Sequence, residues 1–282
     1  MAAAREEVYD EDSRKPQTVV YTDLKGDLLR RDFTVNAMAM DITPDYFGDL
    51  HAPHGGVQDL LAKRLVTPLD PDETFSEDPL RMIRGAYFAS KLGLAIDYEC
   101  LASMKRQADR ITIVSEERIT TEFCKILATD KPSVGLTLLQ DVGLMAHVFP
   151  EIHVMHGMDQ TGEWHHKDIF DHTLQVVDNA AVLSDKMEIR FAALVHDIAK
   201  PNTRRVDKRK GYTFHGHDAV GERMLNKVAK RMKLSNHLRE YLKKLTLLLS
   251  LIHISEPTRL LSIADAGFCV KKNRGGGGGG GG

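Results

Sequence analysis

Side chains that could hold a nucleotide gather near the start of the chain, in the string Arg30-Arg-Asp-Phe-Thr-Val-Asn-Ala37. Arg31 carries a planar fork of donors that suits the oxygens of a phosphate or a ribose. Asp32 can accept hydrogen bonds from ribose hydroxyls, and the amide of Asn36 can both donate and accept. A helix end with solvated arginines would give the same letters, so this string does not decide the matter alone.

A second string, Phe75-Ser-Glu-Asp-Pro-Leu-Arg-Met-Ile-Arg84, favours the nucleotide site. Pro79 suits the first turn of a helix, with acidic residues at its positive end. Asp78, Arg81 and Arg84 are spaced by three and therefore share one face. A carboxylate beside a guanidinium can read the edge of a base, because the acid accepts from an amino group while arginine donates to ring acceptors. A helical salt bridge, worth roughly 0.2–0.5 kcal/mol, is the alternative. The predicted nucleotide-binding residues are Arg31, Asp32, Asn36, Glu77, Asp78, Arg81 and Arg84.

Histidine and aspartate recur further along in a pattern that suits a metal ion. His172 follows Asp171, His196-Asp197 follows an apolar run, and Phe214-His-Gly-His217 comes next. A lone His-Asp pair would be chance, but histidines upstream and downstream favour a metal site. Mixed imidazole and carboxylate ligands suit a divalent first-row transition metal or Mg²⁺. The predicted ligands are His172, His196, Asp197 and His217, with His215 as the alternative to the last.

The elements that must position these residues are mostly helices. Residues 18–21 read as extended, a short helix follows from Asp23, and proline and glycine mark loops over 44–56. Helical spacing then runs over 76–143, where Ser115 and Ser133 are expected to be N-caps and Gly143 to end a helix. A connector (153–164) precedes a second helical block over 167–245. The expected fold is mostly α, with a strand-bearing α+β fragment at the N-terminus.

Composition limits where the protein works and how it could meet nucleic acid. The 282 residues carry 38 basic and 40 acidic side chains, a formal net charge of −2, so RNA could be bound only through local basic faces. Cys100 and Cys124 lack metal-site spacing and fit buried thiols in a reducing cytosol. The polar N-terminus predicts no signal peptide, and no run is long enough to span a membrane. We therefore expect a soluble, cytoplasmic protein.

The end of the chain is unusual. Leu249-Ser-Leu-Ile-His-Ile-Ser-Glu-Pro-Thr-Arg259 resembles the translation of a sequencing adaptor, and Gly275–Gly282 resembles a run of G written when signal is lost. A genuine apolar helix followed by a flexible glycine linker is the alternative. We interpret residues 249–282 as adaptor translation plus poly-Gly, outside the fold.

The strings RRDFTVNA, GDLHAPHGGVQDL, TPLDPDETFSEDPLRMIR and SEERI, in this order, resemble the class II CCA-adding tRNA nucleotidyltransferase and poly(A) polymerase family. The resemblance implies the C-terminal part of a nucleotidyltransferase palm (1–62), a helical neck or RNA-binding domain (63–150) and an all-α HD metal-binding domain (151–248). It also implies that Arg31 and Asp32 contact the sugar and phosphates of the incoming nucleotide. Asp78 and Arg81 would select CTP or ATP, and Arg84 would also bind the nucleotide. The implied partners are tRNA, CTP and ATP, and the implied cofactor for nucleotidyl transfer is Mg²⁺.

The chain departs from the family pattern in one respect. The family holds its catalytic metal ions with an Asp-x-Asp on an early strand after a glycine turn. Asp10-Glu-Asp12 has the spacing but follows no apolar strand, so we assign no catalytic residue and interpret Met1 as an internal start or a contig edge. Tyr87 stands where many relatives have another arginine. The chain is therefore expected to be truncated at both ends and inactive in transfer.

The histidine pattern resembles the HD phosphohydrolase superfamily. His172, His196 and Asp197 match its ligands directly, and its distal aspartate would fall beyond Lys244. Four functions stay open: CCA addition by the intact protein, poly(A) polymerisation by the same residues, metal-dependent phosphohydrolysis by the HD domain, and an inert fragment that binds nucleotide or tRNA weakly. The oligomeric state is not predicted.

Overall fold

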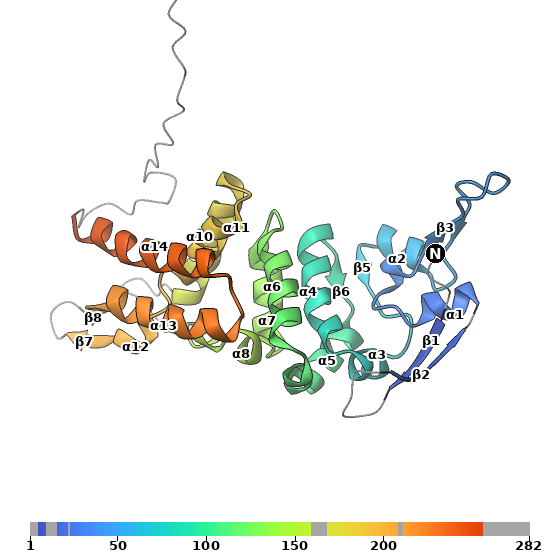
Figure 1. The fold of residues 1–282 in the computed structure, drawn as a ribbon, viewed down its shortest axis with the longest axis horizontal. Helices are drawn as coiled ribbons and strands as arrows, with labels where there is room; N and C mark the ends of the chain where they lie inside the picture. Colours follow the sequence, from blue (N-terminus) through green and yellow to red (C-terminus); the bar gives the residue numbers. More distant parts are fainter. Residues whose placement is uncertain (1–4, 10–15, 22, 159–167, 208–210, 256–282) are drawn as a thin grey trace, which may run out of the picture.

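The computed structural model describes residues 5–9, 16–21, 23–158, 168–207 and 211–255. Helices follow one another along an elongated molecule, with the N-terminal part at one end and the C-terminal part at the other (Figure 1). Strands in the described part of the chain form four two-stranded sheets, so the expected mostly helical class is confirmed. Asp10 to Asp12, the end of the 153–164 connector and residues 256–282 lie outside the described residues.

Short strands and helices make up the N-terminal part. β1 (Arg5–Tyr9) pairs antiparallel with β2 (Pro16–Tyr21), which confirms the expected extended segment. Asp23 caps α1 (Leu24–Leu29) by accepting from the amide of Gly26 at 2.7 Å. The other elements are η1 (Thr34–Asn36), the hairpin of β3 (Ala39–Met40) and β4 (Leu50–His51), and α2 (Gly56–Leu61). α1 and η1 bring the first predicted string against the middle of the molecule.

The middle part is a stack of helices. Its elements are β5 (Arg64–Leu65), α3 (Pro71–Glu77), α4 (Leu80–Leu92), β6 (Ala95–Ile96), α5 (Tyr98–Gln107), η2 (Ala108–Ile113), α6 (Glu116–Leu127), α7 (Pro132–Asp141), α8 (Met145–Val148) and α9 (Pro150–His153). Helix α4 packs on both α6 and α7. A Cβ at Gly135 of α7 would lie 2.5 Å from Ile126 Cγ2 and 3.0 Å from the carbonyl oxygen of Ala86, so the helices meet too closely there for a larger residue.

The C-terminal part holds α10 (Ile169–Leu183), α11 (Met187–Val195), α12 (Lys200–Thr203), β7 (Arg205–Asp207), β8 (Gly211–Thr213), α13 (His217–Arg231) and α14 (Asn236–Ser255). The helical block expected over 167–245 is present but contains one antiparallel hairpin that was not predicted, formed by β7 and β8. Helix α14 runs across the predicted domain boundary at residue 248.

Two expected helix caps differ from the structure. Ser115 occupies the N-cap position of α6, but its side chain makes no capping hydrogen bond. Ser133 lies inside α7, whose N-cap residue is Lys131. The carboxylate of Asp178 on α10 accepts from the amide of Ser133 at 2.9 Å and from its hydroxyl at 2.7 Å. The start of α7 is therefore capped by a residue distant in sequence.

One cluster of buried side chains runs from Phe33 to Leu242 and joins the three parts. Phe123, Phe149 and Phe191 meet at its centre, with ring centroids 5.8, 6.5 and 6.2 Å apart. Cys100 is buried, as expected, whereas Cys124 is half-buried; burial raises the pKa of Cys124 to about 11, which keeps that thiol protonated and unreactive. Among the described residues, no helix combines the length and apolar character needed to cross a membrane.

Candidate functional site

A pocket of about 510 Å³ opens where the first predicted string, the start of α4 and the polar face of α6 meet. It is lined by Arg30, Arg31, Asp32, Asn36, Asp78, Leu80, Arg81, Arg84, Glu117, Arg118, Thr121 and Glu122. Six of the seven residues predicted to bind nucleotide are in this lining. The seventh, Glu77, lies behind it and accepts a hydrogen bond from Arg81 at 2.8 Å.

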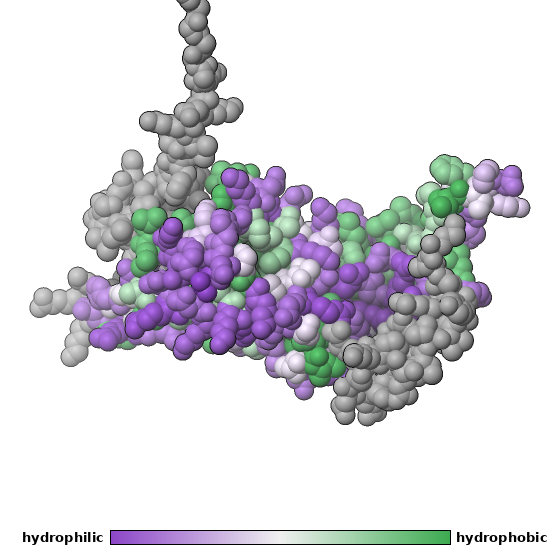
Figure 2. Space-filling view, in the orientation of Figure 1, coloured by the Kyte–Doolittle hydropathy of each residue, from purple (hydrophilic) through white to green (hydrophobic). Residues whose placement is uncertain are grey.

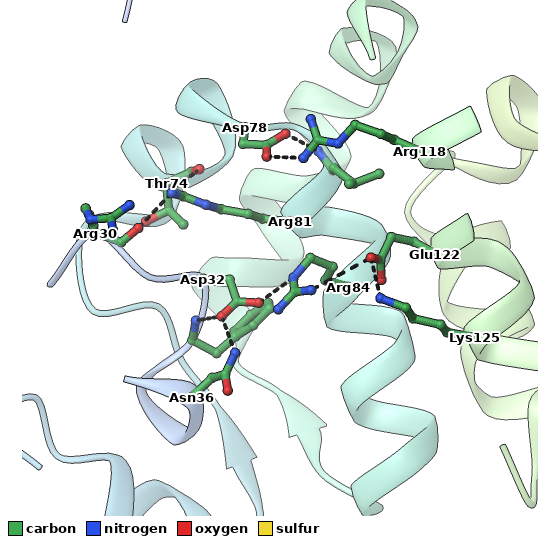
Figure 3. A network of polar contacts seen from close by, with 12 residues as sticks. Arg30, Asp32, Asn36, Thr74, Asp78, Arg81, Arg84, Arg118, Glu122 and Lys125 are labelled. Carbon is green, nitrogen blue, oxygen red and sulfur yellow. Dashed lines mark hydrogen bonds and ion pairs between the residues drawn. The ribbon is translucent and has the colours of Figure 1, made fainter. Parts of the chain in front are cut away.

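Asp32 and Arg84 form the centre of a polar network that crosses the pocket (Figure 3). Asp32 Oδ1 accepts from the next main-chain amide at 2.9 Å and from Asn36 Nδ2 at 3.1 Å, while Oδ2 accepts from Arg84 Nε at 2.7 Å. Arg84 Nη1 also lies 3.8 Å from Glu122 Oε1, which Lys125 Nζ approaches to 2.7 Å. Glu122 Oε2 is buried, and no donor among the described residues bonds to it. The network joins η1, α4 and α6.

Asp78 and Arg81 are held by different partners. Arg118 on α6 donates to Asp78 Oδ2 at 2.9 Å (Figure 3). The guanidinium of Arg81 donates to the carbonyl oxygens of Thr74 at 3.0 Å and Arg30 at 2.7 Å. Both side chains are therefore fixed before any ligand arrives, which lowers the entropy lost on binding.

Arginines dominate the pocket. Five guanidinium groups and four carboxylates line it. Arg31 is half exposed, with 45 % of its side-chain surface accessible, and its one ion-pair partner among the described residues, Asp27 Oδ2, lies at 3.4 Å. A partly exposed guanidinium with one long contact can turn toward a phosphate, for which its fork of donors is suited. The arrangement can therefore hold a polyanion at Arg31 and a polar ring near Asp78 and Arg81.

Sequence reasoning missed the contribution of α6. Glu117, Arg118, Thr121 and Glu122 line the pocket but were not among the predicted site residues. The signal was present, because 118, 121 and 122 are spaced by three and four and share the polar face of an amphipathic helix. Only the folded chain shows that this face meets Asp78 and Arg84.

The second site lies between α10 and the turn after α11. Ligand atoms of His172, His196 and Asp197 all fall within 4.8 Å of one another. His172 Nε2 lies 3.8 Å and His196 Nε2 3.0 Å from Asp197 Oδ2, and Lys200 Nζ lies 2.7 Å from the same oxygen. His196 Nδ1 contacts the carbonyl oxygen of Ala193 at 2.8 Å, which orients its ring with Nε2 toward the cluster.

Comparison with known proteins gives three family models in sequence order. They describe a poly(A) polymerase head domain over residues 1–66, a probable RNA- and SrmB-binding site of polymerase A over 93–155, and an HD domain over 169–266. The curated "Multifunctional CCA protein" of Vibrio campbellii is 38% identical over 223 residues, or 77% of this chain and 52% of that protein. The corresponding protein of Shewanella denitrificans is 36% identical over 226 residues, 78% of this chain and 52% of that protein.

The chain belongs to the CCA-adding and poly(A) polymerase family. It spans about half the length of the curated family members it matches. A solved tRNA nucleotidyltransferase in complex with a primer tRNA and an incoming ATP analogue shares the fold, with a TM-score of 0.58 at 21% identity over 87% of this chain and 64% of that chain. A tRNA-processing enzyme solved with CTP gives a TM-score of 0.57 at 21% identity, over 83% of this chain and 57% of that chain.

The HD part of this CCA-adding family member has a donor set that fits a divalent metal. Two imidazoles and one carboxylate converge in a largely buried place. Asp197 Oδ2 is buried and has charged neighbours but no partner with hydrogen-bond geometry among the described residues. Burial would raise the pKa of Asp197, but the charges of His196 and Lys200 outweigh it and hold that pKa well below its usual range. The carboxylate is therefore ionised and available as a ligand.

The two downstream histidines do not join that cluster. His217 begins α13, and its Nδ1 lies 2.8 Å from the carbonyl oxygen of Phe214. His215 is exposed. The structure thus brings together three of the four residues predicted from the HD pattern, and the place of His217 in the ligand set stays a prediction.

Proposed function

We propose that the protein to which these residues belong adds C, C and A to the 3′ end of tRNA, and that the pocket between α1, α4 and α6 holds the incoming CTP or ATP. The observation that carries this proposal is the convergence of two strings distant in sequence on one arginine-rich pocket. The fold shared with tRNA nucleotidyltransferases and the identity with multifunctional CCA proteins support it.

Each pocket residue has a role that its chemistry allows. Arg31 is assigned to the phosphates, because its side chain is the most exposed of the five arginines that line the pocket. Asp32 is assigned to the ribose hydroxyls, with Asn36 and Arg84 holding its carboxylate. Asp78 can accept from the amino group that cytosine and adenine share, and Arg81 can donate to a ring acceptor. Arg118 then acts as the positioning residue for Asp78.

Mg²⁺ would supply the charge stabilisation that nucleotidyl transfer requires. We assign the carboxylates that hold it to none of the described residues. The proposal is therefore tested by measuring the binding of CTP and ATP to this chain, not by measuring nucleotidyl transfer.

Nucleotide binding by the wild-type chain is expected to include both CTP and ATP, and Asp78→Ala is expected to weaken both by roughly 5- to 150-fold, the value of one good base contact. Isothermal titration with CTP, ATP, GTP and UTP measures this directly. Asp109→Ala, which removes an exposed carboxylate of η2 away from the pocket, is the control and should leave affinity unchanged. Binding of ATP alone would favour a poly(A) polymerase. Binding of neither nucleotide, or equal affinity in Asp78→Ala, would contradict the proposed pocket.

The HD cluster supports a second activity, metal-dependent phosphohydrolysis. The observation that favours it is the convergence of His172, His196 and Asp197. With a metal bound there, the ion would activate water for attack on a phosphate ester. We expect hydrolysis of p-nitrophenyl phosphate or its bis ester to require Mn²⁺ or Mg²⁺, to be lost in His196→Ala and to be kept in Asp78→Ala. Hydrolysis that survives both EDTA and His196→Ala would exclude this site as its source.

A further inference from the structure

Positive charge is concentrated in the C-terminal part of the chain. Residues 200–248 contain fourteen lysines and arginines and four acidic residues, although the whole chain has a formal net charge of −2. The rest of the chain therefore holds 24 basic and 36 acidic residues. A local excess of this size creates a positive potential over one region and attracts polyanions to it.

Helix α13 presents part of this charge as a stripe. Leu225, Val228 and Met232 lie on its buried face. On its opposite face Arg223, Lys227 and Lys230 are exposed, at spacings of four and three that place them in one row, and exposed Lys233 follows directly after the helix. We call these four residues the α13 stripe.

The described part of the chain does not neutralise the α13 stripe. Its four residues form no ion pair with any other residue that the structure describes. Two acidic side chains close to the stripe in sequence have other partners: Glu222 lies 3.3 Å from Lys243 Nζ, and Glu240 lies 3.6 Å from the same nitrogen and 3.1 Å from Arg239 Nε. No large apolar side chain is exposed on α13. The exposed ones that flank it in the described sequence are Val206 and Leu247. The surface over α12 and α13 is accordingly hydrophilic (Figure 2).

The end of α13 is fixed to the part of the chain that the RNA-binding family model matches, residues 93–155. Thr120 of α6 donates to the carbonyl oxygen of Met232 at 2.9 Å. Arg231 forms a bidentate pair with Glu151 of α9 at 2.8 and 2.6 Å. These contacts attach the end of the helix that carries the stripe to the middle part of the molecule, and α13 lies beside that part in the ribbon (Figure 1).

We infer that the α13 stripe binds the phosphate backbone of an RNA helix and that the HD part is thereby a part of the RNA-binding surface. At 1.5 Å per residue, Arg223 and Lys230 stand roughly 10 Å apart, so the row can meet several successive phosphates. RNA helices are recognised mainly through backbone and shape, for which a row of lysines and arginines suffices. An acidic protein partner is disfavoured, because protein interfaces centre on apolar and aromatic side chains that this face lacks. The inference rests on the proposed function, in which tRNA is the substrate.

The test is the salt dependence of RNA binding by the full chain. Fluorescence anisotropy with a labelled tRNA transcript that lacks its CCA end gives Kd over a range of KCl concentrations. Arg223→Gln, Lys227→Gln and Lys230→Gln, combined in one variant, should reduce the slope of log K against log salt by about 2–3. Near physiological salt this loss corresponds to a Kd raised roughly 10- to 100-fold.

Two further variants separate charge from folding and from general electrostatics. Arg223→Lys, Lys227→Arg and Lys230→Arg keep the charges and should keep both Kd and slope. The second variant combines Lys63→Gln, Lys91→Gln and Lys186→Gln, which remove three exposed lysines outside α13. Its slope of log K against log salt should equal that of the wild type. If this matched control lost as much affinity and slope as the α13 variant, the inference would be overturned, because net charge alone would explain both losses.

The outcomes also separate this inference from the proposed function. If the wild type binds tRNA and the α13 variant binds it with the same Kd and slope, the proposed role of the α13 stripe is overturned and the proposed function is not. Binding of CTP without any binding of tRNA would overturn the stripe and leave the nucleotide pocket. Absence of both would overturn the proposed function together with the stripe.

Discussion

Arg190→Ala is expected to lower the free energy of unfolding by about 3–5 kcal/mol, the cost of leaving a buried polar network without its central donor. Arg190 of α11 is buried and donates to the carbonyl oxygens of Leu127 and Thr129 at 2.8 and 2.7 Å. It also donates to those of Ala181 and Ser184 at 3.1 and 2.8 Å.

These four carbonyls stand at the C-terminal ends of α6 and α10, where the helix dipole is negative and the last carbonyls lack partners within the helix. Arg190 therefore satisfies two helix ends at once, one from the middle part and one from the C-terminal part. Its pair with Asp185 adds little, because the Asp185 side chain is fully exposed and water screens the interaction.

Urea unfolding followed by circular dichroism measures this effect, with Arg205→Ala on the exposed face of β7 as the control. Arg190→Lys keeps the charge but cannot reproduce the planar fork, so it should fall between wild type and alanine. A loss below about 1 kcal/mol in Arg190→Ala would mean that water replaces the guanidinium at these carbonyls and that the two parts are not joined through it.

Local patterns predicted the elements whose causes are local. The helix after Asp23 forms where the cap and the leucine spacing place it, and Gly143 ends α7 with a left-handed φ of 82°. Helix α6 appears where apolar spacing predicts it, with Ile119, Phe123 and Ile126 buried. Each depends on a few neighbouring residues, and such signals survive in a single sequence.

Features that depend on distant residues were not predicted. The cap of α7 comes from Asp178, 45 residues beyond Ser133, so no local pattern reveals it. The β7–β8 hairpin is stabilised in part by Arg204, whose guanidinium lies 3.7 Å above the ring of Tyr212. That contact joins two residues eight positions apart, so helical spacing in the sequence did not reveal the hairpin.

The same division applies to the nucleotide pocket. Asp32, Asp78 and Arg84 could be named from two short strings, since each string carries its own chemistry. Arg118 and Glu122 could not, because their roles arise only when α6 packs on α4 and brings them to Asp78 and Arg84. Residues that position the ligand-facing side chains were therefore the ones that could not be predicted from the sequence.

A divalent metal is expected to raise the melting temperature of the wild-type chain, and Asp197→Asn is expected to abolish that rise. A ligand that binds only the folded state stabilises it by about 2.7 kcal/mol at 100 times its Kd. For a chain of this size, that corresponds to a rise of roughly 5–10 °C. Thermal unfolding after treatment with EDTA and stepwise addition of Mn²⁺, Co²⁺ or Mg²⁺ measures it. Two imidazole ligands favour Mn²⁺ and Co²⁺ over Mg²⁺.

The comparison is between rises and not between melting temperatures, because Asp197 also lies 2.7 Å from Lys200 and its replacement disturbs the metal-free protein as well. His172→Ala should lose the rise, while His237→Ala, at an exposed position on α14, should keep it. His217→Ala decides the fourth ligand: a lost rise would make His217 a ligand as the sequence predicts, and a retained rise would leave the three convergent residues. An equal rise in wild type and Asp197→Asn would place the metal elsewhere, since a site of two imidazoles without its only charged ligand cannot keep its affinity.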